Sequence, residues 1–196
     1  MSSQDRPRRG RKPTLSREIV IEAALDLIDS EGLGALNLRK LADRMGISAM
    51  TPYHYFEDKA DLLSAMVEYA MTPLANDLDP NLSSDKQIGA AMRDLHAILD
   101  HHPGVVDLII AESATLRLDE FRQSLIATLQ KAGLTRSRSA DILRSLTSYI
   151  LGYTMLNRLR PERPDRSGPK ESFDVGLEMM LRSLREELDE DRHGRP

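Results

Sequence analysis

Apolar residues recur every three or four positions through most of the chain, the spacing that gives an α-helix one apolar face. The first run begins after Ser16, whose hydroxyl suits a helix N-terminus, and stops at Gly32. A second, short run extends from Asn37 to Met45, and Gly46 follows it as the residue that permits a sharp turn. The same spacing predicts the remaining helices at about 49–56, from 58 onward, and at about 84–101, 103–115, 117–132, 136–158 and 170–189.

The helical pattern is interrupted at two places. Pro73 and residues 77–85, DLDPNLSSD, mark the boundary at which the first half ends, and residues 160–169, RPERPDRSGP, form a loop before the last helix. No segment alternates as a strand does, so an all-α fold is predicted. The expected units are a flexible arm at 1–13, a first helical domain at 14–60 and a larger helical domain at 61–196, whose first helix connects the two.

Composition narrows the class of protein. The 196 residues are 40% hydrophobic and 30% charged, which is typical of a soluble globular protein. There is no Cys, so disulfides and thiolate metal sites are excluded. No apolar run approaches the roughly 18 residues that span a membrane, and the N-terminus lacks the apolar core of a secretory signal. A cytoplasmic protein is therefore expected.

The charge is unevenly distributed along the chain. Residues 1–17 hold six Arg and Lys side chains against Asp5, a net charge of +5, which leaves −9 for residues 18–196 of the total of −4. A basic arm on an acidic body indicates that one end meets a polyanion. The alternative is a solubilising tail with no such partner, and composition does not separate the two.

A short helix, a Gly turn and a second short helix form the arrangement of a DNA-binding helix-turn-helix, with residues 49–56 in the major groove. The aromatic residues support this interpretation, because the chain has five Tyr, three Phe and no Trp, yet Tyr53, Tyr55 and Phe56 fall together. A helix pressed against DNA is covered on two sides, by its own domain and by the duplex. We expect Phe56 to face inward and the two tyrosines to place hydroxyls on phosphates, the alternative being that all three rings are core.

Residues 36–66, LNLRKLADRMGISAMTPYHYFEDKADLLSAM, resemble the DNA-binding domain of the TetR family of one-component transcriptional repressors. The resemblance implies that Tyr53, Tyr55 and Lys59 hold phosphates. Lys59 also stands at a helix N-terminus, where a cation is mildly unfavourable unless an anion binds there too; the alternative is a solvated lysine. Arg39 matches a DNA-contacting position and can pair with guanine. The expected DNA-binding residues are Arg39, Ser48, Ala49, Thr51, Pro52, Tyr53, His54, Tyr55 and Lys59. Met50-Thr51-Pro52 departs from the family pattern, which leaves the bases open.

Residues 118–157 resemble, more loosely, the regulatory domain of the tetracycline-repressor branch of this family. The resemblance implies a ligand site within each helical core and a homodimer formed by the last two helices. Apolar faces at 142–156 and 173–188 favour the dimer, the alternative being that both bury within one subunit. The expected effector pocket comprises Met92, His96, Leu108, Glu112, Phe121, Tyr149, Tyr153 and Asn157, with Leu99 and Leu125 beside them, each of which is otherwise simple core.

Metal binding and catalysis are not expected. His96, His101 and His102 have no ligand partner at i+4, and the residues VVDLIIAES that follow them contain no His, so we predict no metal, no tetracycline–magnesium complex and no cofactor. No nucleophile–base pair or phosphate-binding Gly loop points to an enzyme. The leading hypothesis is a dimeric repressor that binds a palindromic operator and is released by a small-molecule effector. The alternative is a ligand-independent DNA-binding or architectural protein.

Overall fold

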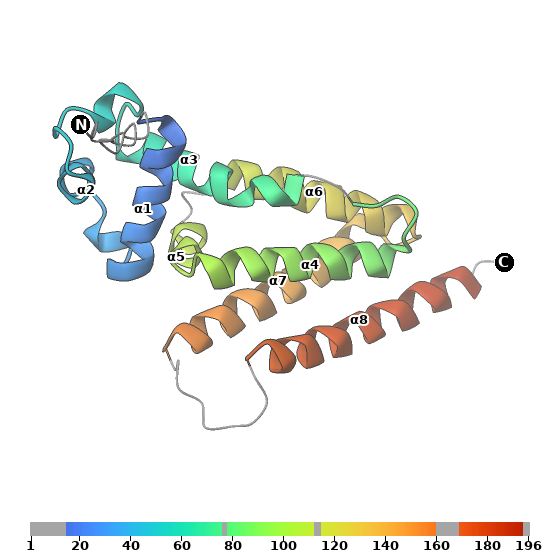
Figure 1. The fold of residues 1–196 in the computed structure, drawn as a ribbon. Coiled ribbons are helices and arrows are strands. Elements are labelled where there is room, and N and C mark those ends of the chain that lie inside the picture. Colours follow the sequence, from blue (N-terminus) through green and yellow to red (C-terminus); the bar gives the residue numbers. More distant parts are fainter. Residues whose placement is uncertain (1–14, 76–77, 112–114, 160–168, 194–196) are drawn as a thin grey trace, which may run out of the picture.

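The chain folds entirely into helices and turns across the residues that the computed structural model describes, namely 15–75, 78–111, 115–159 and 169–193 (Figure 1). This confirms the all-α prediction. The α-helices are α1 (Arg17–Glu31), α2 (Leu38–Met45), α3 (Lys59–Met71), α4 (Ser84–His101), α5 (Gly104–Ile110), α6 (Thr115–Lys131), α7 (Arg136–Leu159) and α8 (Pro169–His193). Short 3-10 helices are η1 (Leu33–Ala35), η2 (Pro52–His54) and η3 (Thr72–Ala75).

The N-terminal helices begin where capping side chains stand. The Ser16 hydroxyl accepts a hydrogen bond from the Ile19 N–H, and the Asn37 side chain accepts one from the Lys40 N–H at 2.8 Å. Gly46 ends α2 in the left-handed conformation, with φ of 65°. These contacts confirm the predicted start of α1 and both ends of α2, because side-chain capping depends only on residues a few positions apart.

The prediction of a regular α-helix at residues 49–56 is wrong. Residues 49–51 form turns, and only Pro52–His54 is helical, as the 3-10 element η2. The cause is Pro52, which has no N–H to donate to the Ser48 carbonyl and whose ring opposes a continuous helix. The Ser48 carbonyl instead accepts from the Thr51 N–H at 2.8 Å, a turn closed one residue earlier. The segment is therefore called the 48–54 turn below.

Helix α3 connects the two halves of the molecule, since it packs on α1 at one end and on α4, α5 and α6 further along (Figure 1). Helix α4 lies in the middle of the larger half and packs against α7 and α8. Helix α5 is shorter than predicted: it ends at Ile110, whereas the predicted helix extends from residue 103 to residue 115. The buried side chains form one continuous core through both halves.

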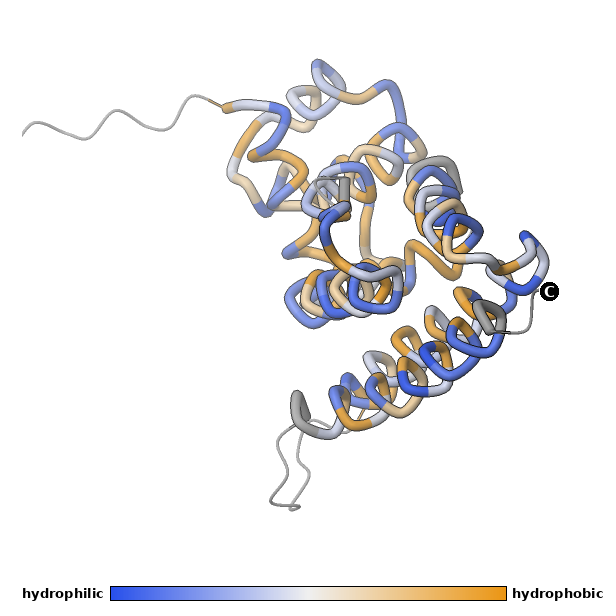
Figure 2. The backbone as a smooth tube through the Cα atoms, turned by 90° about the vertical axis from the view of Figure 1, so that its right-hand side faces the viewer, coloured by the Kyte–Doolittle hydropathy of each residue, from blue (hydrophilic) through white to orange (hydrophobic). Residues whose placement is uncertain are grey.

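Helix α8 lies along the outside of the larger half, with hydrophobic and hydrophilic positions alternating along it (Figure 2). Its predicted apolar stripe is buried within the subunit, because Phe173, Leu177 and Leu181 are each 3% exposed or less. Gly89 of α4 allows this approach, since a Cβ there would lie 2.8 Å from a Leu181 methyl. For these residues the alternative of burial within one subunit holds. A different set stays exposed, comprising Met155, Leu156, Leu159, Val175 and Met179.

Candidate nucleic-acid interface

Two of the three clustered aromatic residues hold the 48–54 turn to the protein. Phe56 faces inward as predicted and is 1% exposed. The Tyr55 ring is half-buried against the core, and its hydroxyl donates a 2.9 Å hydrogen bond to the Leu15 carbonyl oxygen. Tyr53 points away and is 50% exposed. The aromatic crowding therefore has two purposes, anchoring at Tyr55 and Phe56 and an outward surface at Tyr53.

Arg17 strengthens this anchorage from the first turn of α1. Its guanidinium lies 4.9 Å from the centre of the Phe56 ring, a cation–π arrangement, and 3.9 Å from an Asp61 carboxylate oxygen. Asp61 also accepts from the Glu57 N–H at 3.0 Å, while its own N–H donates to the Asp58 carboxylate at 2.9 Å. The start of α3 and the end of the turn are thus held together by side chains.

The exposed cations of this face fall into two groups. Lys40 and Arg44 both contact the Glu31 carboxylate, at 2.5 and 3.3 Å, and the Lys40 hydrogen bond lowers the pKa of Glu31. These two residues tie α2 to the end of α1. Arg39 and Lys59 are exposed, and within the described ranges neither has an ion pair. Lys59 is the first residue of α3, so its charge stands beside that helix's free N–H groups.

The predicted DNA-binding residues thus divide by exposure. Arg39, Ser48, Tyr53, His54 and Lys59 are exposed, whereas Ala49, Thr51 and Tyr55 are half-buried and Pro52 is buried. Pro52 is buried, and the Tyr55 hydroxyl already donates to the Leu15 carbonyl, so both residues make structural contacts in this conformation. The exposed residues belong to α2, to the segment between α2 and α3, and to the start of α3, all near the end of the molecule that carries α1 and α2 (Figure 1).

A set of polar contacts around Asp29, called the Asp29 joint below, connects this end to the larger half. The Asp29 carboxylate near the end of α1 accepts from the Gly104 N–H at 2.7 Å and lies 2.9 Å from His102 Nδ1. Asp29 therefore caps the start of α5 from another helix. Arg158 of α7 in turn contacts the Asp107 carboxylate of α5 at 2.9 Å. Sequence patterns did not indicate this joint, because its partners are more than fifty residues apart.

Three of the expected pocket residues meet in an aromatic cluster between α4, α7 and α8. The rings of His96 and Phe173 are 3.6 Å apart edge to face, and Tyr153 lies 5.7 Å from His96. The Tyr149 hydroxyl donates to the Phe173 carbonyl at 2.9 Å, and burial raises the pKa of Tyr149. Nε2 of His96 is buried without a hydrogen-bond partner among the described residues. Phe173 was predicted only as part of the α8 stripe.

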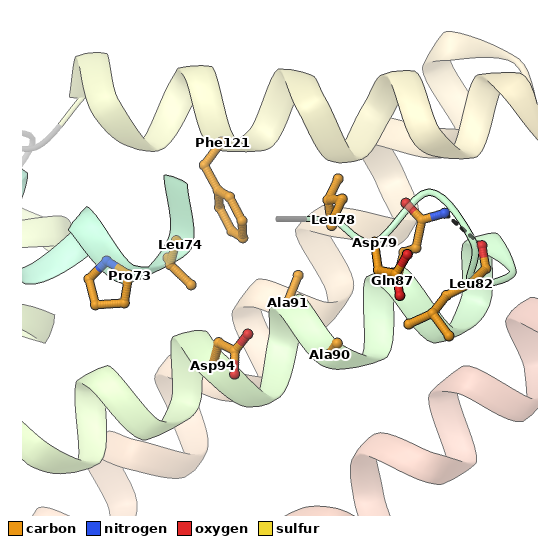
Figure 3. Close-up of a pocket in the computed structure, with 10 residues that line it drawn as sticks. All are labelled: Pro73, Leu74, Leu78, Asp79, Leu82, Gln87, Ala90, Ala91, Asp94 and Phe121. Atoms are coloured by element: carbon orange, nitrogen blue, oxygen red, sulfur yellow. Dashed lines mark hydrogen bonds between the residues drawn. The ribbon is translucent and has the colours of Figure 1, made fainter. Parts of the chain in front are cut away.

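Phe121 lies apart from this cluster. It points from α6 towards α4 and lines a small hollow of about 50 Å³, partly open to solvent (Figure 3). Leu74, Leu78 and Ala91 form its apolar wall, and Asp94 lies at the same hollow. Of the remaining expected pocket residues, Met92 and Leu108 are buried, Asn157 is half-buried and Glu112 lies outside the described residues.

The described residues show neither a metal-binding cluster nor a membrane-spanning helix. No group of three or more His, Asp and Glu side chains is arranged to hold a metal ion in these parts of the chain. None of the described helices combines the length and the apolar character needed to cross a membrane.

Part of the chain matches a known protein family. Residues 20–66 match the profile of the family described as bacterial regulatory proteins, tetR family. The HTH-type transcriptional repressor DrrR1 of Streptomyces coeruleorubidus is 28% identical over 169 residues, which cover 83% of this chain and 61% of DrrR1. The tetracycline repressor protein class A from transposon 1721 of Escherichia coli is 28% identical over 208 residues, covering 87% of this chain and 90% of that protein.

A similar solved structure is a possible TetR family transcriptional regulator from Streptomyces coelicolor A3(2), with a TM-score of 0.72 and 25% identity. The likeness covers 87% of this chain and 98% of that chain. The chain spans about 60% of the length of the first curated relatives it matches. The matched residues, the relatives and the shared all-helical architecture agree: residues 20–66 carry a domain of the tetR family of bacterial regulatory proteins, and the chain is similar to named transcriptional regulators over most of its length.

Proposed function

We propose that this protein is a homodimeric transcriptional repressor that binds a palindromic double-stranded DNA operator and is released by a small-molecule effector. The observation that carries the proposal is the pairing pattern at the 48–54 turn. Tyr55 and Phe56 anchor the turn, while Tyr53, Arg39 and Lys59 point outward without ion pairs in the described chain. Unpaired cations beside an anchored turn suit phosphate contacts that fix a protein on a duplex.

The residues proposed to contact DNA are fewer than those predicted from the sequence. Lys59 and the N–H groups at the start of α3 would share one phosphate, and Tyr53 would donate its hydroxyl to another. Arg39, Ser48, Thr51 and His54 would meet base edges. Pro52 and Tyr55 instead hold the turn in place. The basic arm at 1–13, outside the described residues, would add charge to the domain at 14–60.

The homodimer is proposed at the outer face of α7 and α8. Met155 and Leu156 on α7, with Val175 and Met179 on α8, expose apolar side chains on neighbouring helices. A second copy packed across this face by a two-fold axis would bury them in a four-helix interface. Such a dimer would present two 48–54 turns, each for one half-site about one DNA turn from the other.

The effector site is proposed in the larger domain at 61–196, around the aromatic cluster and the hollow beside Phe121. The unpartnered His96 Nε2 supports the site, because a buried nitrogen without a partner gains when a ligand supplies one. Movement there would reach the DNA-binding end through α5 and the Asp29 joint. An effector releases DNA only if it binds the released conformation more tightly.

Two alternatives predict different behaviour. A ligand-independent or architectural DNA-binding protein would gain no thermal stability from any member of a library of small amphipathic molecules. We propose no enzymatic activity, in keeping with relatives that are named as regulators, and turnover of a substrate by the full chain would contradict this. We also propose that this protein is cytoplasmic, as a regulator of transcription in a bacterium would be.

The test is selection of bound duplexes from a random pool by the full chain, at a stated near-physiological salt concentration because phosphate contacts are strongly salt-dependent. The proposal expects a recovered palindrome with half-sites about one turn apart. Recovery of unrelated sequences, from protein whose dimeric mass has been verified and which has been refolded to remove bound ligand, would overturn it.

A further inference from the structure

Met50 is an exposed apolar side chain within the 48–54 turn, between the proposed DNA contacts Ser48 and Tyr53. It is 65% exposed, and among residues 15–74 it and Tyr53 are the two large hydrophobic side chains that lie exposed. The other large apolar residues of α1, α2 and α3 are buried or half-buried. Tyr53 has a hydroxyl that gives it a polar contact, whereas Met50 offers only a methyl group and a thioether.

The backbone of the turn holds Met50 outward. The Met50 N–H donates to the Ser48 hydroxyl oxygen at 3.4 Å, and the Thr51 N–H donates to the Ser48 carbonyl at 2.8 Å. Pro52, two residues later, is buried and begins η2. The position of Met50 is therefore set by backbone hydrogen bonds of the turn, while Met50 itself stays 65% exposed.

The chemistry of methionine excludes a phosphate contact. Its thioether is a weak acceptor and has no proton to donate, so it gains nothing beside an anion. The apolar feature of the major groove is the C5-methyl group of thymine. A flexible, polarisable side chain adapts to such a group. Arg39 and Lys59, exposed cations without an ion pair among the described residues, would bring the DNA backbone against it.

We propose that Met50 recognises the C5-methyl group of a thymine in each operator half-site. The proposal rests on the proposed function, since it assigns one specificity contact within the same DNA surface. Removing one buried methyl group should weaken binding roughly fourfold for each half-site. Two symmetric half-sites should together lose roughly tenfold or more, if the losses are independent.

The experiment uses the full chain and the palindrome recovered by selection. Each thymine is replaced in turn by deoxyuridine, symmetrically in both half-sites, which removes the methyl group and leaves base pairing intact. Dissociation constants are measured at one salt concentration for the wild type, Met50→Gln and Met50→Leu. Ile110→Gln is the control, because Ile110 is 58% exposed on α5 and has no part in the DNA surface.

The proposal expects one thymine per half-site at which deoxyuridine weakens the wild type and Ile110→Gln alike. Met50→Gln should bind the thymine and deoxyuridine duplexes within about 1.5-fold of each other, and Met50→Leu should keep most of the preference. Because Met50 is exposed, both variants should unfold at the wild-type urea concentration. Equal deoxyuridine sensitivity in the wild type and Met50→Gln would overturn the proposal.

The outcomes separate this inference from the proposed function. A selected palindrome that no deoxyuridine replacement weakens, or that has no thymine, removes the Met50 contact and leaves the repressor intact. Failure to select any sequence overturns both. If Met50→Gln abolishes association with another protein while DNA binding is unchanged, the exposed methionine serves a protein partner and the proposal is again overturned.

Discussion

The Tyr55 hydroxyl donates its proton to the Leu15 carbonyl oxygen, 2.9 Å away and forty residues earlier in the chain. This bond joins the 48–54 turn to the residue that precedes the cap of α1. It occupies a tyrosine that the family resemblance would assign to a phosphate. The turn is consequently positioned by the protein before any DNA arrives, with Tyr53 left outward.

Replacing Tyr55 by Phe should therefore affect folding first. The variant keeps the ring and loses the hydrogen bond, so the free energy of unfolding should fall by about 1 kcal/mol. Urea unfolding measures the change. Tyr53→Phe is the matched control, and it should leave stability unchanged while weakening DNA binding. The opposite pattern, with Tyr55→Phe affecting only DNA, would show that the hydroxyl serves a phosphate.

Lys59 and Lys40 should differ in their effect on salt dependence. Lys59→Ala removes a proposed phosphate contact, so the slope of log affinity against log salt should decrease by roughly one. Lys40 forms an ion pair with Glu31 and is not proposed to contact a phosphate, so Lys40→Ala should change that slope much less. The measurement is affinity for the selected duplex across a salt series. Equal slopes for Lys59→Ala and the wild type would remove Lys59 from the phosphate contacts.

Arg39 should contribute to sequence preference. If it pairs with guanine, Arg39→Ala should cost about 1–3 kcal/mol of discrimination at one or two base positions. Competition between the selected duplex and its single-base variants measures this cost. Arg44→Ala is the control from the same helix, because Arg44 contacts Glu31. A loss that is equal on selected and random duplexes would make Arg39 a backbone contact.

Gly104 lies at the start of α5, directly against Ile28 and Asp29 of α1. A Cβ at this position would be 2.7 Å from Cγ1 of Ile28 and 2.9 Å from the Ile28 backbone carbon. Gly104→Ala should therefore destabilise the protein by about 1–3 kcal/mol in urea unfolding. Gly34→Ala is the control, since no atom lies within 4 Å of its Cβ. Similar stability for both variants would mean that the joint readily adjusts.

The capped helix starts could be predicted because their causes are local. Ser16, Asn37 and Asp58 each accept from an N–H three residues later, so residue type and spacing are sufficient. The segment at 49–56 was harder, since aromatic crowding and the Gly turn indicated a helix while Pro52 opposed it. Pro52 cannot donate the backbone hydrogen bond that a continuous helix needs there, and only Pro52–His54 is helical.

Long-range contacts set the limit of sequence reasoning at the site. Periodicity identified an apolar stripe on α8, but it did not tell whether the stripe meets α4 and α7 or a second subunit. Asp29 carries no local sign that it caps α5. The inward orientation of Tyr55 likewise depends on the Leu15 carbonyl, which is remote in sequence.

The most direct test of the central claim is the effect of half-site spacing on affinity. Five base pairs inserted between the half-sites of the selected palindrome rotate one half-site by about half a turn of DNA. A rigid dimer that inserts two 48–54 turns should lose most of its specific affinity, falling towards its binding of random DNA. Unchanged affinity for the lengthened duplex would contradict a two-fold regulator bound to a palindromic operator.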